Sequence, residues 1–294
     1  VPRAGRAPRR LIPMRRVGPG RPEPLGVTPE DGGANVAVHS AHAEAIELCL
    51  FDPGSATERE RIALPARSGD VFHGFVAGVV AGDRYGLRAH GAYEPRHGHR
   101  FNPAKLLVDP YARALDRPFA LHPSMLGAGA DGAGAALRDR VDSAPYVPRG
   151  IVTGRPLPAP DRRPRVPWGD TILYELHVRG FTRTHPGVPD ALRGTCAGLA
   201  HPAALAHLTR LGVTTVELMP IAAAVDEPHL TRLGLTNYWG YNPVALFVPD
   251  PRLAPGGIAE LRDCVAALHA AGIEVVLDVV LNHSGEGDAR GPTL

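Results

Sequence analysis

The sequence contains only three cysteines, Cys49, Cys196 and Cys264, at wide spacings. This small, odd number cannot form the disulfide framework of a secreted scaffold, and no Cys-x-x-Cys pair is present to hold structural zinc. The cysteine content therefore favours a reducing compartment, and the cytoplasm is the expected location.

Long apolar runs are also missing. No stretch approaches the roughly 18 apolar residues that a membrane-spanning helix needs, so a membrane partner is not expected. The first 22 residues carry seven arginines and no acidic residue, but they lack the apolar core of a signal peptide because Pro13 interrupts it. We therefore predict that residues 1–22 form a disordered, arginine-rich extension.

Lysine is nearly absent, since one lysine stands beside 31 arginines. The formal net charge of +2 depends on the seven N-terminal arginines, because without them 25 basic residues face 30 acidic ones. The rest of the chain is mildly acidic and lacks the basic surface that binds a nucleic-acid backbone. The charge pattern therefore argues against nucleic acid as a partner.

Short alternating apolar runs dominate residues 25–92, as at Ile46, Leu48 and Leu50. A period of two places the apolar side chains on one face of a strand. Turn-forming clusters such as residues 52–54 separate the runs. The spacing predicts an N-terminal antiparallel β-sandwich over residues 25–92.

Proline and glycine punctuate residues 93–167, which predicts a connecting segment with little regular structure. Gly127, Gly129 and Gly132 match the glycine pattern of dinucleotide-binding loops. No strand pattern precedes them and no amphipathic helix follows, so the context that positions a dinucleotide phosphate is absent. No cofactor is expected.

After Trp168 the pattern changes to alternating strands and helices. Strands are predicted over residues 171–178, 213–220 and 273–281. Amphipathic helices are predicted between them, over residues 201–211 and 258–271. Gly212 and Gly272 stand where the two helices should end. The nearly continuous apolar strands predict a parallel sheet, as in an α/β barrel or a doubly wound sheet.

In parallel α/β folds the working residues collect where the strands end. The third predicted strand carries Asp278, and Asn282 and His283 follow it. A carboxylate inside an apolar strand is costly unless it is paired, so Asp278 is expected either to hold an arginine or to take part in catalysis. Glu175 and Glu217 lie on the other two strands, where an internal ion pair is a simpler interpretation than catalysis.

The segment 237–243 holds three of the sixteen aromatic residues of the chain, Tyr238, Trp239 and Tyr241. Aromatic faces combine apolar area with a polar rim, which suits the C–H face of a sugar ring. Packing of a long loop onto the rim of the sheet is the alternative. Exposure of the rings in a cleft would distinguish the sugar-binding interpretation from the packing interpretation.

Other reactive side chains give weaker signals. His97 and His99 have no third ligand at a recognisable spacing, so no metal site is predicted. No Gly-x-Ser-x-Gly elbow is present, and Cys264 lies among apolar residues in the middle of a predicted helix. A serine or cysteine nucleophile is therefore not expected.

Six long segments resemble the bacterial glycogen debranching enzymes of the α-amylase superfamily, glycoside hydrolase family 13. They occur in the same order and extend the resemblance from about Pro24 to the last residue. The segments are SAHAEAIELCLFD at 40–52, GHRFNPAKLLVDPYAR at 98–113, YELHVRGFT at 174–182, RGTCAGLAHPA at 193–203, NYWGYNPVALF at 237–247 and AGIEVVLDVVLNHS at 271–284.

The resemblance implies a multidomain β plus α/β protein. An Ig-like β-sandwich, a carbohydrate-binding module of family 48, would occupy residues 25–92, followed by the connecting segment 93–167. Residues 168–294 would form the first three βα units of a TIM (β/α)8 barrel. The implied activity is retaining hydrolysis of α-1,6 branch linkages by two carboxylates, and the implied partner is glycogen or another branched α-glucan.

The resemblance also implies substrate-binding residues. Tyr241 would stack under the glucosyl unit being cleaved, and Asp278 and His283 would belong to the same subsite, the histidine through a hydrogen bond to the sugar and the aspartate by orienting an arginine. Asn282 is not transferred as a calcium ligand, because debranching enzymes often lack that site.

One departure from the family limits these expectations. Its nucleophile, acid/base and stabilising aspartate come from strands four, five and seven, whereas residues 168–294 contain three predicted strands, and a complete barrel takes roughly 250 residues. We therefore expect an incomplete barrel with no catalytic carboxylate and no debranching by this chain alone. The alternatives are an isoamylase or maltooligosyltrehalose trehalohydrolase of the same superfamily, and a non-catalytic glycan-binding protein.

Overall fold

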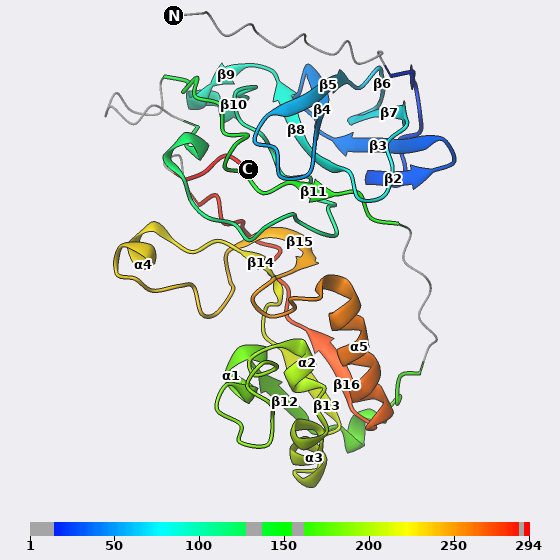
Figure 1. The fold of residues 1–294 in the computed structure, drawn as a ribbon, viewed down its shortest axis with the longest axis vertical. Helices are drawn as coiled ribbons and strands as arrows, with labels where there is room; N and C mark the ends of the chain where they lie inside the picture. The colour runs from blue at the N-terminus through cyan, green and yellow to red at the C-terminus, as the bar shows by residue number, and fades with distance from the viewer. Residues whose placement is uncertain (1–14, 128–136, 155–161, 288–290) are drawn as a thin grey trace, which may run out of the picture.

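The computed structural model describes residues 15–127, 137–154, 162–287 and 291–294. Figure 1 shows an antiparallel β part above and a part below in which helices pack on a parallel sheet. The irregular segment that follows the β part in sequence lies between them, together with the β14–β15 pair.

Two antiparallel sheets form the β part. The first has the order β1-β7-β3-β2, with β6 also paired to β7, and the second has the order β11-β8-β4-β5. The strands are β1 (Val17–Gly18), β2 (Gly26–Glu30), β3 (Gly33–His39), β4 (Ala45–Phe51), β5 (Glu58–Ala63), β6 (Ala66–Ser68), β7 (Val71–Ala77), β8 (Arg84–His90) and β11 (Gly150–Ile151). The alternating apolar positions meet in one core, where Val36, Leu48, Val76 and Leu87 are all buried.

The predicted disordered extension over residues 1–22 is wrong for its last part. β1 pairs antiparallel with β7. Arg15 donates from Nε to Glu60 at 2.8 Å and from Nη1 to the Ala77 carbonyl at 2.9 Å. Arginine content predicted a solvated tail, but partners distant in the sequence hold this part in place. Residues 1–14 lie outside the described residues.

The predicted connecting segment, residues 93–167, is largely irregular in backbone but is packed where it is described. Leu106, Met125 and Val147 are fully buried in a core that includes Phe51 of β4. β11 adds to the second sheet beside β8, so the sandwich recruits a strand from outside residues 25–92. The other short elements are β9 (Tyr93–Glu94), β10 (His99–Arg100), η1 (Pro95–His97) and η2 (Pro123–Met125). Residues 128–136 and 155–161, with Gly129 and Gly132 of the glycine pattern, lie outside the described residues.

A buried lysine helps to explain the order of this segment. The Lys105 side chain is fully buried, and its Nζ donates to the carbonyls of Ser124 at 2.6 Å and Val141 at 2.8 Å. Nζ also donates to Asp139 at 2.5 Å. The ammonium has three hydrogens and each finds an acceptor, so the desolvated charge is compensated. Hydropathy patterns do not predict such polar contacts.

The second part contains a parallel three-stranded sheet in the order β12-β13-β16 and an antiparallel pair, β14 and β15. The strands are β12 (Leu173–Leu176), β13 (Thr215–Leu218), β14 (Ala222–Ala224), β15 (Pro243–Pro249) and β16 (Glu274–Leu277). The helices are α1 (Val178–Thr182), α2 (Cys196–Leu199), α3 (Pro202–Arg210), α4 (Pro228–Arg232) and α5 (Gly257–Ala270), and the turn η4 (Trp168–Asp170) precedes β12. None of the helices in the described ranges is long and apolar enough to cross a membrane.

Helices cover one face of the parallel sheet. Leu176 of β12 and Leu218 of β13 are buried in a core with Leu208 of α3 and Leu268 of α5. On the other face, Glu175 of β12, Glu217 of β13 and Val276 of β16 lie side by side in register. Glu175 and Val276 are exposed, so this second face is open.

The third predicted strand, residues 273–281, is longer than the observed β16. The ladder ends where the Asp278 amide donates to the Leu218 carbonyl at 2.9 Å, because β13 ends at Leu218. Among the described residues, β16 has no strand partner on its other edge. Val279 and Leu281 consequently lack a ladder and are 58% and 76% exposed.

Candidate functional site

The candidate site lies at the carboxyl ends of the three parallel strands. His177 follows β12, Pro220 lies two residues beyond β13, and Asp278 follows β16 directly. Parallel strands bring their carboxyl ends to the same edge of a sheet, so these positions share one rim. The long chain segment between β13 and β15 places the aromatic residues of segment 237–243 at this rim.

Tyr241 and Asp278 make direct contact at the rim. The Tyr241 hydroxyl donates to Asp278 Oδ2 at 2.6 Å. This hydrogen bond, followed by burial and by the negative charges of Asp278, Glu175 and Glu217, raises the pKa of Tyr241 to about 12. Tyr241 is therefore a protonated hydrogen-bond donor at neutral pH, and its ring remains 37% exposed.

His283 holds the same tyrosine by its backbone. His283 Nε2 lies 2.6 Å from the Tyr241 carbonyl, which can only accept, so Nε2 carries a hydrogen. The Asn282 amide Nδ2 lies 2.8 Å from His283 Nδ1, which therefore accepts. The resemblance placed Tyr241, Asp278 and His283 in one subsite, and the structure brings the three together. Both ring nitrogens of His283 have partners within the protein, and its hydrogen bond to a sugar stays a prediction.

The aromatic loop carries a second group of rings beside Tyr241. The rings of Tyr238 and Trp239 meet edge to face, with centroids 5.1 Å apart and an interplanar angle of 87°. Tyr238 is 45% exposed and Trp239 is 55% exposed. Both residues are therefore partly exposed rather than fully packed against the rim.

Two contacts shape the backbone of this loop. The Gly240 amide donates to Asn237 Oδ1 at 2.9 Å, which closes a tight turn. Gly240 has a φ of +80°, and a Cβ at this position would lie 3.0 Å from the Pro220 carbonyl oxygen. A left-handed backbone pressed against another chain segment favours glycine. The turn between Tyr238 and Tyr241 is therefore specified by the sequence.

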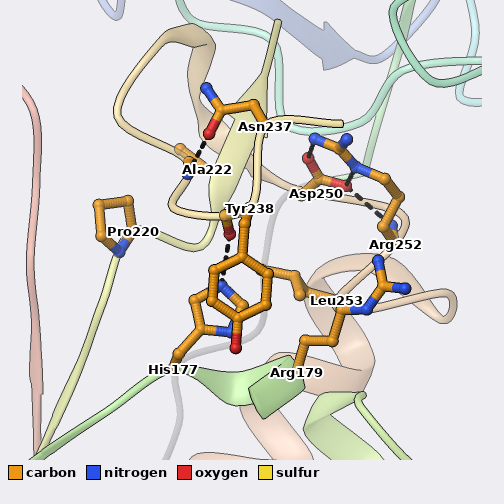
Figure 2. Close-up of a pocket in the computed structure, with 10 residues that line it drawn as sticks. His177, Arg179, Pro220, Ala222, Asn237, Tyr238, Asp250, Arg252 and Leu253 are labelled. Atoms are coloured by element: carbon orange, nitrogen blue, oxygen red, sulfur yellow. Dashed lines mark hydrogen bonds and ion pairs between the residues drawn. The ribbon is translucent and has the colours of Figure 1, made fainter. Parts of the chain in front are cut away.

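His177 is a member of the site to which the sequence assigned no role. Figure 2 shows its ring under the ring of Tyr238, in a small pocket that Arg179 and the Asp250–Arg252 ion pair also line. The two rings are stacked with centroids 4.1 Å apart. Burial lowers the pKa of His177, the positive charge of Arg179 acts in the same direction, and the hydrogen bond to the Tyr238 carbonyl opposes both. The sequence feature that could have identified His177 as a site residue is its position directly after a predicted strand.

The two strand glutamates do not form the ion pair that the sequence suggested. Glu175 and Glu217 are neighbours in register, and neither makes an ion pair with any residue in the described ranges. Two like charges side by side are unfavourable unless solvent or another group compensates them. Both carboxylates lie on the open face of the sheet and contribute negative potential at Tyr241.

The remaining candidates lie apart from this rim. His97 Nδ1 is 3.1 Å from Glu94, and the ring of His99 meets the ring of His42 at 5.2 Å. In the portion of the chain that the structure describes, no three histidine, cysteine or acidic side chains gather as a metal site. Cys49, Cys196 and Cys264 are all buried.

Comparison with known proteins defines the class of this architecture. Residues 24–112 match the family model of carbohydrate-binding module 48 (isoamylase N-terminal domain). The fold resembles a pullulanase from Anoxybacillus sp. LM18-11 in complex with maltotetraose, with a TM-score of 0.63 and 24% identity over 89% of this chain and 35% of that one. An α-amylase-like protein from Salmonella typhimurium gives a TM-score of 0.56 at 22% identity, covering 90% of this chain and 34% of the other. The chain thus has a carbohydrate-binding-module sandwich joined to a fold of the pullulanase and amylase type.

The sequence relatives are more specific. The chain is 52% identical to a glycogen debranching enzyme from Yersinia enterocolitica over 94% of its length, and 47% identical to one from Klebsiella pneumoniae over 96% of its length. The resemblance to bacterial glycogen debranching enzymes of glycoside hydrolase family 13 is therefore confirmed. The chain spans 41% and 42% of the lengths of these two curated relatives.

Proposed function

We propose that this chain supplies the glucose-holding part of a hydrolase that cleaves α-1,6 linkages in glycogen and related branched α-glucans. The observation that carries the proposal is the contact of Tyr241 with Asp278 and His283 at the carboxyl ends of parallel strands. The 52% identity to a glycogen debranching enzyme supports the choice of substrate.

The chemistry of the three residues suits this role. The exposed ring of Tyr241 offers an apolar face to the C–H groups of a glucosyl unit. Asp278 Oδ2 accepts from the tyrosine hydroxyl, which leaves Oδ1 to accept from a sugar hydroxyl or from a guanidinium. His283 fixes the Tyr241 backbone, so the ring meets the sugar at a fixed angle.

We further propose that β12, β13 and β16 with their helices are the first three βα units of a (β/α)8 barrel. The parallel order, the common register and the coverage of only one face support this assignment. In a barrel the open face with Glu175 and Glu217 is the interior. Retaining hydrolysis needs two carboxylates about 5–5.5 Å apart across the scissile bond. The resemblance assigns them to later strands, so the activity is proposed for a polypeptide in which those strands accompany this segment.

A chimeric enzyme tests the proposal. The matching segment of the Yersinia enterocolitica relative is replaced by residues 15–294 of this chain, and release of reducing ends from phosphorylase-trimmed glycogen is measured. We expect hydrolysis of α-1,6 linkages by the chimera and none by the 294-residue chain alone. A folded chimera that leaves branch points intact would contradict the proposal. Preference for long-branched amylopectin or for maltooligosyltrehalose would instead support an isoamylase or a trehalohydrolase.

The match of residues 24–112 to carbohydrate-binding module 48 favours a second role, glycan binding by the sandwich. Tyr111, the one large aromatic residue of this range that is exposed, stacks on Phe247 of β15 at 5.5 Å and is thus engaged at the junction with the second part. Retention of the chain on immobilised glycogen tests this role when the Tyr241→Ala substitution is also present. Retention of that variant would support binding by the sandwich, and its passage through the column would leave the sandwich a structural role.

A further inference from the structure

The segment after β12 contacts the aromatic loop in a way that the proposed glucose site does not use. The Gly180 amide donates to His177 Nδ1 at 3.0 Å. His177 Nε2 lies 2.6 Å from the Tyr238 carbonyl, which can only accept. The imidazole is therefore neutral, with its hydrogen on Nε2, and links the start of α1 to the loop. Figure 2 shows the contact with the Tyr238 carbonyl.

Gly180 completes this contact. A Cβ at Gly180 would lie 2.3 Å from the Tyr238 hydroxyl oxygen, far closer than atoms approach without bonding. Glycine is disfavoured inside a helix such as α1, so its presence there calls for a reason. The Tyr238 hydroxyl occupies the space above Gly180, so an alanine there would require the end of the tyrosine side chain to shift. The ring of Tyr238 therefore stacks on His177, and its hydroxyl lies over Gly180.

We propose that His177 and Gly180 form a seat for Tyr238, and that His177 is a positioning residue for Tyr241 through the loop they share. The loop couples the position of Tyr238 to that of Tyr241, because the Asn237–Gly240 hydrogen bond fixes the turn between them and Gly240 packs against Pro220. Movement of Tyr238 therefore displaces Tyr241. The consequence for sugar binding rests on the proposed role of Tyr241, whereas the seat itself rests only on the contacts described.

The seat requires neutral His177, which gives it a pH signature. Protonation would place a hydrogen on Nδ1 opposite the Gly180 amide hydrogen, and two donors would then face each other. The charged groups that face the same pocket are Arg179 from α1 and the Arg252–Asp250 ion pair after β15. Burial and, to a smaller extent, the positive charge of Arg179 lower the pKa of His177, which favours the neutral imidazole.

Two substitutions separate the functions of the two ring nitrogens. The amide nitrogen of glutamine occupies the place of Nε2, so His177→Gln keeps the donor to the Tyr238 carbonyl. The side-chain oxygen of asparagine occupies the place of Nδ1, so His177→Asn keeps the acceptor for Gly180 and loses the donor to Tyr238.

Gly180→Ala removes the space for the tyrosine hydroxyl. Gly169→Ala is its control, because no atom lies within 4 Å of the Cβ position there.

The test uses the full 294-residue chain with Trp168→Phe, which leaves Trp239 as the only tryptophan. The emission of Trp239 reports the loop, because its ring contacts Tyr238 and His177. We expect His177→Asn and Gly180→Ala to shift the emission maximum and to weaken maltotriose binding by about five- to tenfold, the effect of one lost hydrogen bond. Gly169→Ala should match the parent in both measurements. His177→Gln keeps the donor to the Tyr238 carbonyl but loses the stacked ring and the acceptor for Gly180, so it should lie between the parent and His177→Asn.

The pH dependence distinguishes positioning from general stability. The parent emission should change as the pH falls below 6.5, and the change should be absent in His177→Gln. Parental emission in His177→Asn, or an unchanged pH transition in His177→Gln, would overturn the seat. If the parent binds no maltotriose, the glucose site of this chain is contradicted, while the emission measurements still decide the seat.

Discussion

The hydroxyl of Tyr241 lies 2.6 Å from Oδ2 of Asp278, and this contact joins the aromatic loop to the end of the third parallel strand. The two residues are 37 positions apart in the sequence. Their contact joins a loop side chain to a side chain at the end of the sheet.

The contact should be visible in the ionisation of Tyr241. Because Asp278 and the nearby carboxylates raise its pKa to about 12, the folded protein should retain this phenolic proton up to that pH. A raised tyrosine pKa contributes stability that is present below the unfolded value near 10 and is lost as the pH rises from about 10 towards 12. Burial also raises the pKa of Tyr85, so absorbance at 295 nm should show two tyrosines that ionise late, and Asp278→Asn should return only Tyr241 towards 10. Identical titrations of both proteins would show that the contact is absent in solution.

Tyr241→Phe removes the hydroxyl but keeps the ring. The loss of one hydrogen bond should weaken maltotriose binding by about two- to tenfold, whereas Tyr241→Ala should weaken it further because the stacking face is also lost. Isothermal titration calorimetry measures both. Tyr93→Phe in β9, which also removes a tyrosine hydroxyl with a hydrogen bond but lies away from the rim, is a matched control that should bind as the parent does. Equal affinity of the phenylalanine and alanine variants would argue against stacking.

The buried ammonium of Lys105 should hold the irregular segment in place. Lys105→Met leaves Asp139 Oδ2 and two carbonyls without the lysine donor, so unfolding should require about 3–5 kcal/mol less free energy. Arg21→Met removes an exposed ion pair with Glu30 and should change the free energy of unfolding far less, because solvent screens exposed charges. Urea unfolding followed by circular dichroism measures the difference. Equal midpoints for the two variants would mean that the segment is not packed as described.

The exposed apolar residues beside β16 should make this chain self-associate. Val279 and Leu281 are largely exposed beside a strand edge that is unpaired within the described residues. Unpaired apolar edges are sites of aggregation, and a charge there opposes it. Val279→Lys with Leu281→Lys should reduce light scattering, while Val80→Lys on the sandwich, where valine is 57% exposed, should not. The same reduction in both would indicate a general effect of charge.

Parts of the fold were predictable because local signals decide them. Gly212 and Gly272 mark the ends of α3 and α5, and both have the positive φ, +75° and +79°, that favours glycine after a helix. The meeting of Tyr241, Asp278 and His283 followed from the resemblance. The position of Asp278 at the end of its strand was the local part of that signal.

Other parts depend on partners that are distant in the sequence. The arginine content around Arg15 predicted disorder, but Glu60 and β7 hold it. Lys105 gave no hydropathy signal, although its three acceptors order a proline-rich segment. His177 was overlooked because its role depends on the Tyr238 carbonyl, 61 residues away. The length of β16 is set by the end of β13 rather than by its own apolar residues.

The most direct test compares kcat/KM for α-1,6 hydrolysis in the chimera with residues 15–294 of this chain against the same chimera carrying Asp278→Asn. Asp263→Asn, an exposed aspartate of α5, is the matched control. We expect Asp278→Asn to lower kcat/KM by about tenfold or more and the control to leave it unchanged. Equal kcat/KM values for the parent chimera and its Asp278→Asn variant would contradict it.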